Sequence, residues 1–458
     1  MLARLRTVAP KGTAVTSASE TPVALKGEVR SLTGLRIVAA LWVVCFHFSF
    51  TPGVNAYSSV WRPVQPLVHI GALGVDMFYV LSGFVITLTY LDKLGSRPSV
   101  RGSVAFWWAR VCRVWPVYAL VTTIFFGWVL YRSHRVTDGF VVWQTQQPVI
   151  DVWHWLLQLT MTQLWARPYS DGSSFVGPAW SISAEWAAYV LFPLVVLLLW
   201  RVRRAPVVVT AALAVACMVP MAWLCYQTGN PYYSFSWALR IGLGFLAGAF
   251  TCLTVRRLRV TERVEGIAAG VAVLAVLEVL VGAWWGWWRG QGQLEYGGVV
   301  VVLFPVLVGA LALSRRGLSR VLATGPMVHG GRISYSLYLV HVPVFEVFWS
   351  YMGWSPRVAP GTALATFLVP QLLLLVLLLA HLSYRYVEEP ARLWLRGRGP
   401  GRWSRRERGA AQVLAVGTAQ GDEAVRQTPF IAPPEAADVP LMRVDRSAPP
   451  LGDRAPGN

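Results

Sequence analysis

Residues 31–48 read SLTGLRIVAALWVVCFHF, and this stretch decides how the rest of the chain is interpreted. It is apolar over most of its length, but it contains Arg36 and His47. A helix needs about 20 mostly apolar residues to cross the hydrocarbon core of a bilayer. We therefore predict a first membrane span over 34–51 that carries two ionisable side chains.

The composition of the whole chain is typical of a membrane protein. Of its 458 residues, 55% are hydrophobic and 14% are charged, whereas about 25% of residues are charged in an ordinary soluble domain. This balance excludes a disordered, collagen-like or coiled-coil chain and argues against a cytosolic enzyme. The predicted fold is an all-α integral membrane protein, a bundle of about ten transmembrane helices. The predicted spans are 34–51, 69–91, 111–131, 179–200, 206–226, 235–254, 264–283, 297–314, 333–352 and 362–385.

The positive charge is distributed as in a multi-span protein. The net charge is +19, from 41 Lys and Arg against 22 Asp and Glu. The basic residues form short clusters in alternate connections between the apolar runs, so we expect no nucleic-acid partner. Cytoplasmic connections are enriched in Lys and Arg. The pattern therefore predicts that both termini are cytoplasmic, which requires an even number of spans.

Three regions follow from these patterns. Residues 1–33 form a polar cytoplasmic tail without the apolar core of a cleaved signal peptide. Residues 34–396 form the transmembrane domain, and 397–458 form a disordered cytoplasmic tail. The Trp-rich segment 150–165 is too short to span and is expected to be an interfacial or re-entrant helix in the long connection 132–178. The five cysteines lie far apart without metal-ligand spacing, so no metal site is predicted.

Arg36 and His47 are expected on one face of the first helix. Eleven residues at 100° each bring His47 about 20° past three full turns from Arg36, and roughly 16 Å along the helix. Charged groups in hydrocarbon are costly, so an ionisable residue inside a span is a candidate for function. Arg36 either extends to the membrane surface or takes part in function, whereas a deep histidine aligned with an arginine suits proton transfer in a tunnel.

Other polar residues lie inside predicted spans. Asp76 is expected to face inward in the second span. Glu185 and Arg240 lie at similar depth, where an ion pair between them is one interpretation. His341, with Tyr338 nearby, is either a second proton relay or a packing histidine.

The second span also contains small residues. Ser82 lacks the Gly-x-Ser-x-Gly context of a nucleophile, so we favour a packing or hydrogen-bonding role for it. Gly71, Gly74 and Gly83 permit close contact between helices. Three ionisable residues without a motif are expected to be structural or lipid-facing: Glu278, Glu346 and His381.

Arg110 and Arg113 lie three residues apart at the cytoplasmic end of the third span and project to one side of the helix. The enrichment of cytoplasmic ends in arginine is one explanation for them. The other is a phosphate clamp, because arginine binds phosphate with two parallel hydrogen bonds.

Five segments, in this order, resemble the acyltransferase-3 family of integral membrane O-acyltransferases. They are SLTGLRIVAALWVVCFHF (31–48), GVDMFYVLSGF (74–84), FWWARVCRVWPVY (106–118), WSISAEW (180–186), and SYSLYLVH (334–341) with YRYVEEPAR (384–392). The resemblance implies about ten transmembrane helices in the bacterial cytoplasmic membrane. It also implies transfer of an acyl group, often acetyl, from cytoplasmic acyl-CoA to a hydroxyl of a carbohydrate or similar acceptor.

The resemblance assigns roles to individual residues. The essential arginine and histidine of the family correspond to Arg36 and His47, and its Arg-x-x-Arg motif corresponds to Arg110 and Arg113, which are implied to contact the donor. Its other motif positions fall on Ser82, Gly83, Phe84, Trp180, Ser181 and Glu185.

The expected site therefore has three groups of residues. The catalytic group is His47, Asp76 and Glu185. The group that binds acyl-CoA is Arg36, Arg110 and Arg113. The supporting group is Ser82, Trp180, Arg240, Tyr338 and His341.

In this scheme His47 acts as a general base or carries the acyl group covalently. Acyl-CoA is a co-substrate, and no permanently bound cofactor is expected. Arg240 is followed by IGLGFLAG, without the acidic residue found there in other members, which leaves its pairing open. The C-terminal tail is too short for the SGNH-type domain that many members carry. The chain is thus expected to be a stand-alone unit, with any acceptor handling left to a separate extracytoplasmic protein.

The alternative function is a multi-span transporter of a small metabolite, which would also place polar residues on facing helices. The sequence contains no inverted repeat and no paired broken helices, and these features would favour a transporter.

Overall fold

The computed structural model describes residues 28–134, 144 and 146–399. These residues form helices and connections and include no β-strand. Within the same residues, nine helical segments are long and apolar enough to cross a membrane. The predicted all-α membrane bundle is thereby confirmed, while the cytoplasmic placement of the termini stays a prediction. Most of the two predicted tails, 1–27 and 400–458, lies outside the described residues.

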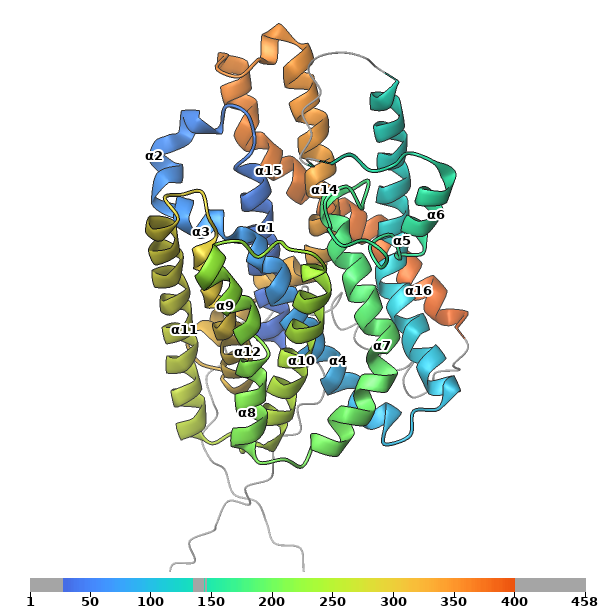
Figure 1. The fold of residues 1–458 in the computed structure, drawn as a ribbon, viewed down its shortest axis with the longest axis vertical. Helices are drawn as coiled ribbons and strands as arrows, with labels where there is room; N and C mark the ends of the chain where they lie inside the picture. Colours follow the sequence, from blue (N-terminus) through green and yellow to red (C-terminus); the bar gives the residue numbers. More distant parts are fainter. Residues whose placement is uncertain (1–27, 135–143, 145, 400–458) are drawn as a thin grey trace, which may run out of the picture. The chain divides into compact units, whose positions relative to one another are not determined.

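Figure 1 shows the arrangement of the helices. The long elements are α1 (Arg30–Phe48), α4 (Gly74–Leu94), α5 (Val100–Ser133), α7 (Trp180–Val202), α8 (Val207–Ala216), α9 (Val219–Thr228), α10 (Ser236–Arg257), α11 (Glu262–Arg289), α12 (Phe304–Leu313), α14 (Gly325–Trp354), α15 (Ala363–Ser383) and α16 (Glu389–Gly397). The short elements are η1 (Val54–Tyr57), α2 (Ser58–Trp61), η2 (Arg62–Val64), α3 (Gln65–His69), η3 (Gly71–Leu73), α6 (Val152–Leu159), η4 (Gly177–Ala179), η5 (Tyr296–Leu303), α13 (Leu318–Leu322), η6 (Pro356–Val358) and η7 (Tyr384–Glu388).

Two predicted spans are broken helices. The span predicted at 206–226 consists of α8 and α9, and α9 has a proline in its first turn. Proline lacks the N–H that would continue the preceding helix. The span predicted at 297–314 begins with the 3-10 helix η5 and continues as α12, again with a proline at the start. The backbone of η5 approaches α11 closely, because an added Cβ at Gly286 would lie 2.0 Å from the Gly297 nitrogen.

Two other predicted helices differ in length from the helices that the structure contains. The span predicted at 333–352 lies inside α14, a 30-residue helix that is rich in Gly, Ser, His and Tyr and is not among the nine apolar segments. The segment predicted as an interfacial helix at 150–165 is helical only in α6, which begins where the Asp151 side chain accepts a hydrogen bond from the His154 N–H at 2.7 Å.

The helices differ in how deeply they are buried. In the segment Gly71–Leu94, which contains α4, 83% of the most apolar stretch is buried inside the protein, whereas in α11 the buried share is 22%. In Figure 1, α8, α9 and α11 lie on one side of α10, and α5 and α16 lie on the other. We infer that α4 belongs to the core of the bundle and that the exposed apolar face of α11 contacts lipid.

Glycines bring α4 against its neighbours. A Cβ at Gly83 would lie 1.9 Å from the Phe245 carbonyl oxygen in α10, and a Cβ at Gly248 of α10 would lie 1.9 Å from the Val80 carbonyl oxygen in α4. Gly71 and Gly74 meet α1 in the same way, with a Cβ at either position 2.6 Å from an α1 carbonyl oxygen. The predicted role of these glycines in close helix contact is confirmed.

A buried ion pair joins the same two helices. The Arg240 guanidinium of α10 donates to both carboxylate oxygens of Asp76 in α4, from Nε at 3.0 Å and from Nη2 at 2.7 Å. The two side chains are 2% and 1% exposed. The suggested pairing of Arg240 with Glu185 is therefore wrong, because α4 rather than α7 presents its carboxylate to the guanidinium.

We expect Gly248→Ala to destabilise the protein by about 1–3 kcal/mol, the usual cost of overpacking a close contact. Thermal unfolding of the purified protein in detergent measures the effect. The matched control is Gly242→Ala in the same helix, where nothing lies within 4 Å of the added Cβ. Equal midpoints for the two variants would contradict the contact between α4 and α10.

Removal of one member of the ion pair, in Asp76→Ala or Arg240→Ala, should cost about 3–5 kcal/mol, because the remaining charge is buried without a partner. The double variant Asp76→Leu with Arg240→Met should lose less stability than either single variant. Thermal unfolding again provides the measurement. Wild-type stability of the single variants would show that the pair has no structural role.

Candidate functional site

Arg36 and His47 lie on α1 and line two different cavities. Arg36 lines a small cavity of about 50 Å³, together with Ser82, Glu185 and Tyr335. His47 lines a large cavity of about 570 Å³. We refer to these as the small cavity and the large cavity. Val75 and Tyr338 line both cavities, so the two meet at these side chains.

Arg36 has donor capacity that the described residues do not use. Its Nε is buried and has no hydrogen-bond partner, and no ion pair within the described part of the chain includes it. The guanidinium carbon lies 5.8 Å from the centre of the Phe78 ring. Because buried donors are normally satisfied, Arg36 is prepared to bind an anion or a carbonyl oxygen in the small cavity.

His47 lies next to a second histidine. Its Nδ1 is 3.0 Å from the Val43 carbonyl oxygen and 3.2 Å from Nε2 of His341 in α14. His47 is 7% exposed and His341 is fully buried. The structure thus brings together two histidines that are 294 positions apart in the sequence. This arrangement permits both predicted roles of His341, proton relay and packing.

Hydroxyl groups surround the junction of the two cavities. The Tyr338 hydroxyl lies 2.7 Å from Ser181 Oγ and donates to the Pro178 carbonyl oxygen at 3.0 Å. Deeper in the bundle, the Tyr189 hydroxyl donates to Glu185 Oε1 at 2.5 Å and lies 3.0 Å from Ser82 Oγ. Ser82 is therefore part of a hydrogen-bonded chain that ends at Glu185, which agrees with a hydrogen-bonding role.

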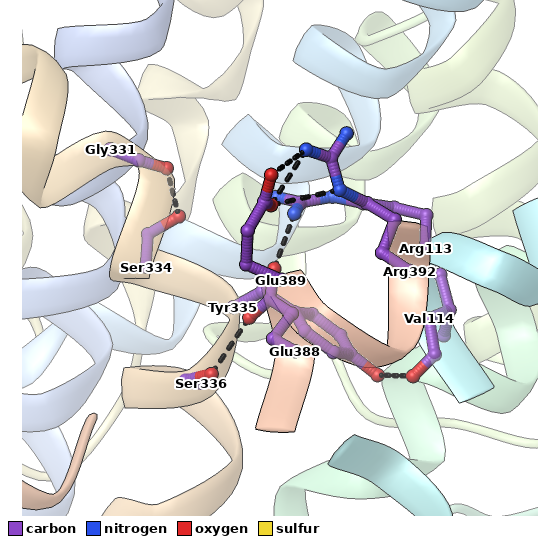
Figure 2. A network of polar contacts seen from close by, with 9 residues as sticks. All are labelled: Arg113, Val114, Gly331, Ser334, Tyr335, Ser336, Glu388, Glu389 and Arg392. Atoms are coloured by element: carbon purple, nitrogen blue, oxygen red, sulfur yellow. Dashed lines mark hydrogen bonds and ion pairs between the residues drawn. The ribbon is translucent and has the colours of Figure 1, made fainter. Parts of the chain in front are cut away.

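The two arginines of the Arg-x-x-Arg motif have different partners. Arg113 forms an ion pair with Glu388, and the Ser336 hydroxyl donates to the other oxygen of the same carboxylate at 2.7 Å (Figure 2). Arg110 donates from Nη2 to the Tyr90 hydroxyl at 3.3 Å, while its Nε is buried without a partner. Arg110 is therefore more available to a ligand than Arg113.

Glu388 lies in η7, a single π-helical turn that links α15 to α16. Figure 2 shows Glu388 and Glu389 next to one another, with Glu389 bound to Arg392 of α16. Such π-turns occur frequently at functional sites. The sequence signal for Glu388 was a pair of glutamates directly after the last apolar run, but our interpretation assigned it no role.

Asp76 and Trp180 lie around the buried guanidinium of Arg240. Both Asp76 oxygens accept from Arg240, so this carboxylate is engaged in structure rather than available as a base. The Arg240 guanidinium also lies over the Trp180 ring, 5.5 Å from its centre. Trp180 in turn lines the large cavity, which places it between the ion pair and the space next to His47.

The remaining ionisable residues have separate surroundings. Glu346 accepts from Arg132 at 3.3 Å. His381 lies 3.2 Å from His329. Glu278 is exposed on α11. No group of His, Cys, Asp or Glu suited to a metal ion occurs among the residues that the structure describes.

The sequence analysis missed several residues of the large cavity, among them His69 and Glu295. His69 ends the short helix α3, and Glu295 precedes η5. His69 is the first residue of the span predicted at 69–91, and Glu295 lies in a connection; neither belongs to a recognisable motif, so only their position in the folded chain associates them with His47.

Comparisons with known proteins identify the family of the chain. Residues 29–383 match the family model described as an acyltransferase domain. The acyltransferase MdmB of Streptomyces mycarofaciens is 28% identical over 81% of this chain and 93% of that protein. The O-acetyltransferase OatA of Staphylococcus aureus is 26% identical over 79% of this chain, but the match spans only 57% of that longer protein. No solved structure matches. The family model covers most of the chain, and we conclude that the chain belongs to the acyltransferase-3 family of membrane acyltransferases.

Proposed function

We propose that this protein moves an acyl group, most simply acetyl, from acyl-CoA to a hydroxyl of a carbohydrate-type acceptor. The observation that carries the proposal is the pair of meeting cavities, with Arg36 in one and His47 in the other. A transfer between two substrates needs two adjoining sites and a proton-transfer group at the acceptor site, and His47 lines the large cavity. The OatA relative is an O-acetyltransferase, which supports oxygen as the acceptor atom.

The donor is assigned to the side of the small cavity. The phosphates of acyl-CoA need cations, and Arg110 offers unused donors near Arg392 and Arg396 of α16. Arginine suits phosphate because its planar guanidinium donates in parallel pairs. The pantetheine arm would then carry the thioester past Arg36, whose unpartnered Nε is able to donate to the thioester oxygen as negative charge develops there.

His47 is assigned the proton transfer. In the direct route it takes the proton of the acceptor hydroxyl while the oxygen bonds to the thioester carbonyl carbon. The C–S bond then breaks, and the thiolate takes up a proton, leaving an ester and free CoA. In the covalent route a His47 nitrogen attacks the thioester carbonyl carbon, the C–S bond breaks, and CoA leaves as a thiolate that takes up the imidazole proton. The acceptor oxygen then bonds to the acyl carbon while the acyl–nitrogen bond breaks, and the freed imidazole takes up the hydroxyl proton. A radiolabelled acyl-protein, trapped without acceptor, would identify the covalent route.

We expect acetyl-CoA to raise the unfolding temperature of the detergent-purified protein. A ligand that binds only the folded state adds about 2.7 kcal/mol at a hundredfold excess over its Kd. Arg110→Ala should lose the shift, whereas the control Arg320→Ala, an exposed arginine elsewhere, should keep it. If acetyl-CoA and other acyl-CoAs leave the wild type unchanged, the donor assignment is wrong and a screen of small transported solutes becomes the next experiment.

His47→Ala should lower acyl transfer by about 10²–10⁴-fold, the usual contribution of a general acid–base residue. Transfer of radiolabelled acetyl to membrane glycans measures the effect, and the acetyl-CoA thermal shift checks that the variant still folds and binds the donor. The control is His134→Ala, an exposed histidine at the end of α5. Wild-type transfer by His47→Ala would refute the mechanism.

A further inference from the structure

The large cavity has polar atoms that nothing in the described protein satisfies. Oε2 of Glu295 and Nε2 of His69 are both buried and lack hydrogen-bond partners. Both residues line the same cavity as His47. Buried polar atoms are normally hydrogen-bonded, and an unsatisfied one costs about 1–3 kcal/mol. Two such atoms in one cavity indicate a place where a ligand supplies the missing partners.

The backbone holds Glu295 in position. The preceding turn contains Gln291 and Gly292 with left-handed φ angles of 51° and 70°. A Cβ at Gly292 would lie 2.8 Å from the Trp287 ring. Position 292 therefore requires glycine for two reasons: its left-handed φ angle and the lack of room for a side chain. The Glu295 N–H donates to the Gly229 carbonyl oxygen at 2.7 Å, which ties the turn to the end of α9.

The same turn holds His69. The Trp287 ring lies edge-on to the imidazole, with ring centres 5.2 Å apart and planes at 80°. The backbone of Leu294 is also hydrogen-bonded to this histidine, while the histidine Nε2 has no partner. One short segment of chain therefore positions both Glu295 and His69, as expected for a built binding site rather than for two accidental neighbours.

Burial of Glu295 disfavours the ionised form of its carboxyl group. Burial raises the pKa of Glu295 to about 7, an effect that Asp76 reinforces and that Arg240 and Tyr232 oppose. Burial also lowers the pKa of His69 below its usual value. Near neutral pH the carboxyl group is thus able to accept or donate, and the imidazole is uncharged. This combination suits neutral hydroxyl groups better than a strongly charged ligand.

The rest of the cavity wall combines aromatic and polar side chains. Trp180, Tyr232 and Tyr338 contribute aromatic rings, and Gln293 lies next to Glu295 in sequence. A sugar ring has an apolar face that packs on aromatic rings and a rim of hydroxyl groups that need hydrogen-bond partners. The wall therefore matches a saccharide more closely than a purely apolar molecule.

We propose that Glu295 and His69 bind the sugar ring of the acceptor in the large cavity and hold one of its hydroxyl groups toward His47. The proposal rests on the proposed acyltransferase function and extends it by assigning the acceptor site to two residues outside the motifs. Glu295 and His69 act here as positioning residues, because the transferred proton is assigned to His47.

The test uses the full-length purified protein and four probes: methyl β-glucoside, N-acetylglucosamine, glucosamine and chitotriose. Thermal unfolding is recorded with each probe at increasing concentration. At least one probe should raise the unfolding temperature of the wild type. Glu295→Ala and His69→Ala should each weaken binding of that probe by about tenfold or more, as expected for the loss of a strong hydrogen bond.

The matched control is Glu278→Ala, a substitution of an exposed glutamate on α11 that should bind the sugar as the wild type does. The acetyl-CoA shift serves as the second readout and should be unchanged in Glu295→Ala, which would show that the variant folds and binds the donor. A wild-type acetyl-CoA shift without any sugar effect would overturn the acceptor site alone. A sugar effect of equal size in all variants would overturn the roles of Glu295 and His69. Absence of the acetyl-CoA shift in the wild type would overturn the proposed function instead.

Discussion

The bidentate pair between Asp76 and Arg240 is the interaction on which the arrangement of the core depends. Neither charge is stable alone in the membrane interior, so each holds the helix of the other in place. The pair lies in the same interface in which Gly83 and Gly248 let the backbones of α4 and α10 approach. Once α4 is fixed in this way, Val75 and Ser82 are fixed at the walls of the cavities.

The ionisable residues of the bundle divide into two kinds according to their partners. Asp76, Glu388 and Glu346 each bind an arginine from a distant helix, and these pairs hold α10, α5 and α14 in the bundle. Arg36 and Glu295 instead direct an unsatisfied buried atom at a cavity. A satisfied charge stabilises the structure, whereas an unsatisfied one lowers stability unless a ligand completes it. The second kind therefore indicates where substrates are expected to bind.

Part of the candidate site could be predicted from the sequence. Arg36 and His47 belong to one helix, so the helical period alone places them on one face. The ion pairs of Arg240 and Arg113 could not be predicted, because their partners Asp76 and Glu388 lie 164 and 275 positions away in the sequence. His69 and Glu295 were missed altogether, since His69 begins the apolar run predicted at 69–91, Glu295 lies in a connection, and no motif distinguishes either residue.

The sequence by itself determined that this protein is an all-α membrane bundle, because the length of each apolar run can be counted directly along the chain. It also determined the family, through short motifs whose order is preserved along the chain. Only the tertiary structure decided which carboxylate neutralises which arginine and which polar atoms remain for a ligand. Those outcomes depend on the rotation and spacing of helices that are far apart in sequence, and the contacts between helices set both.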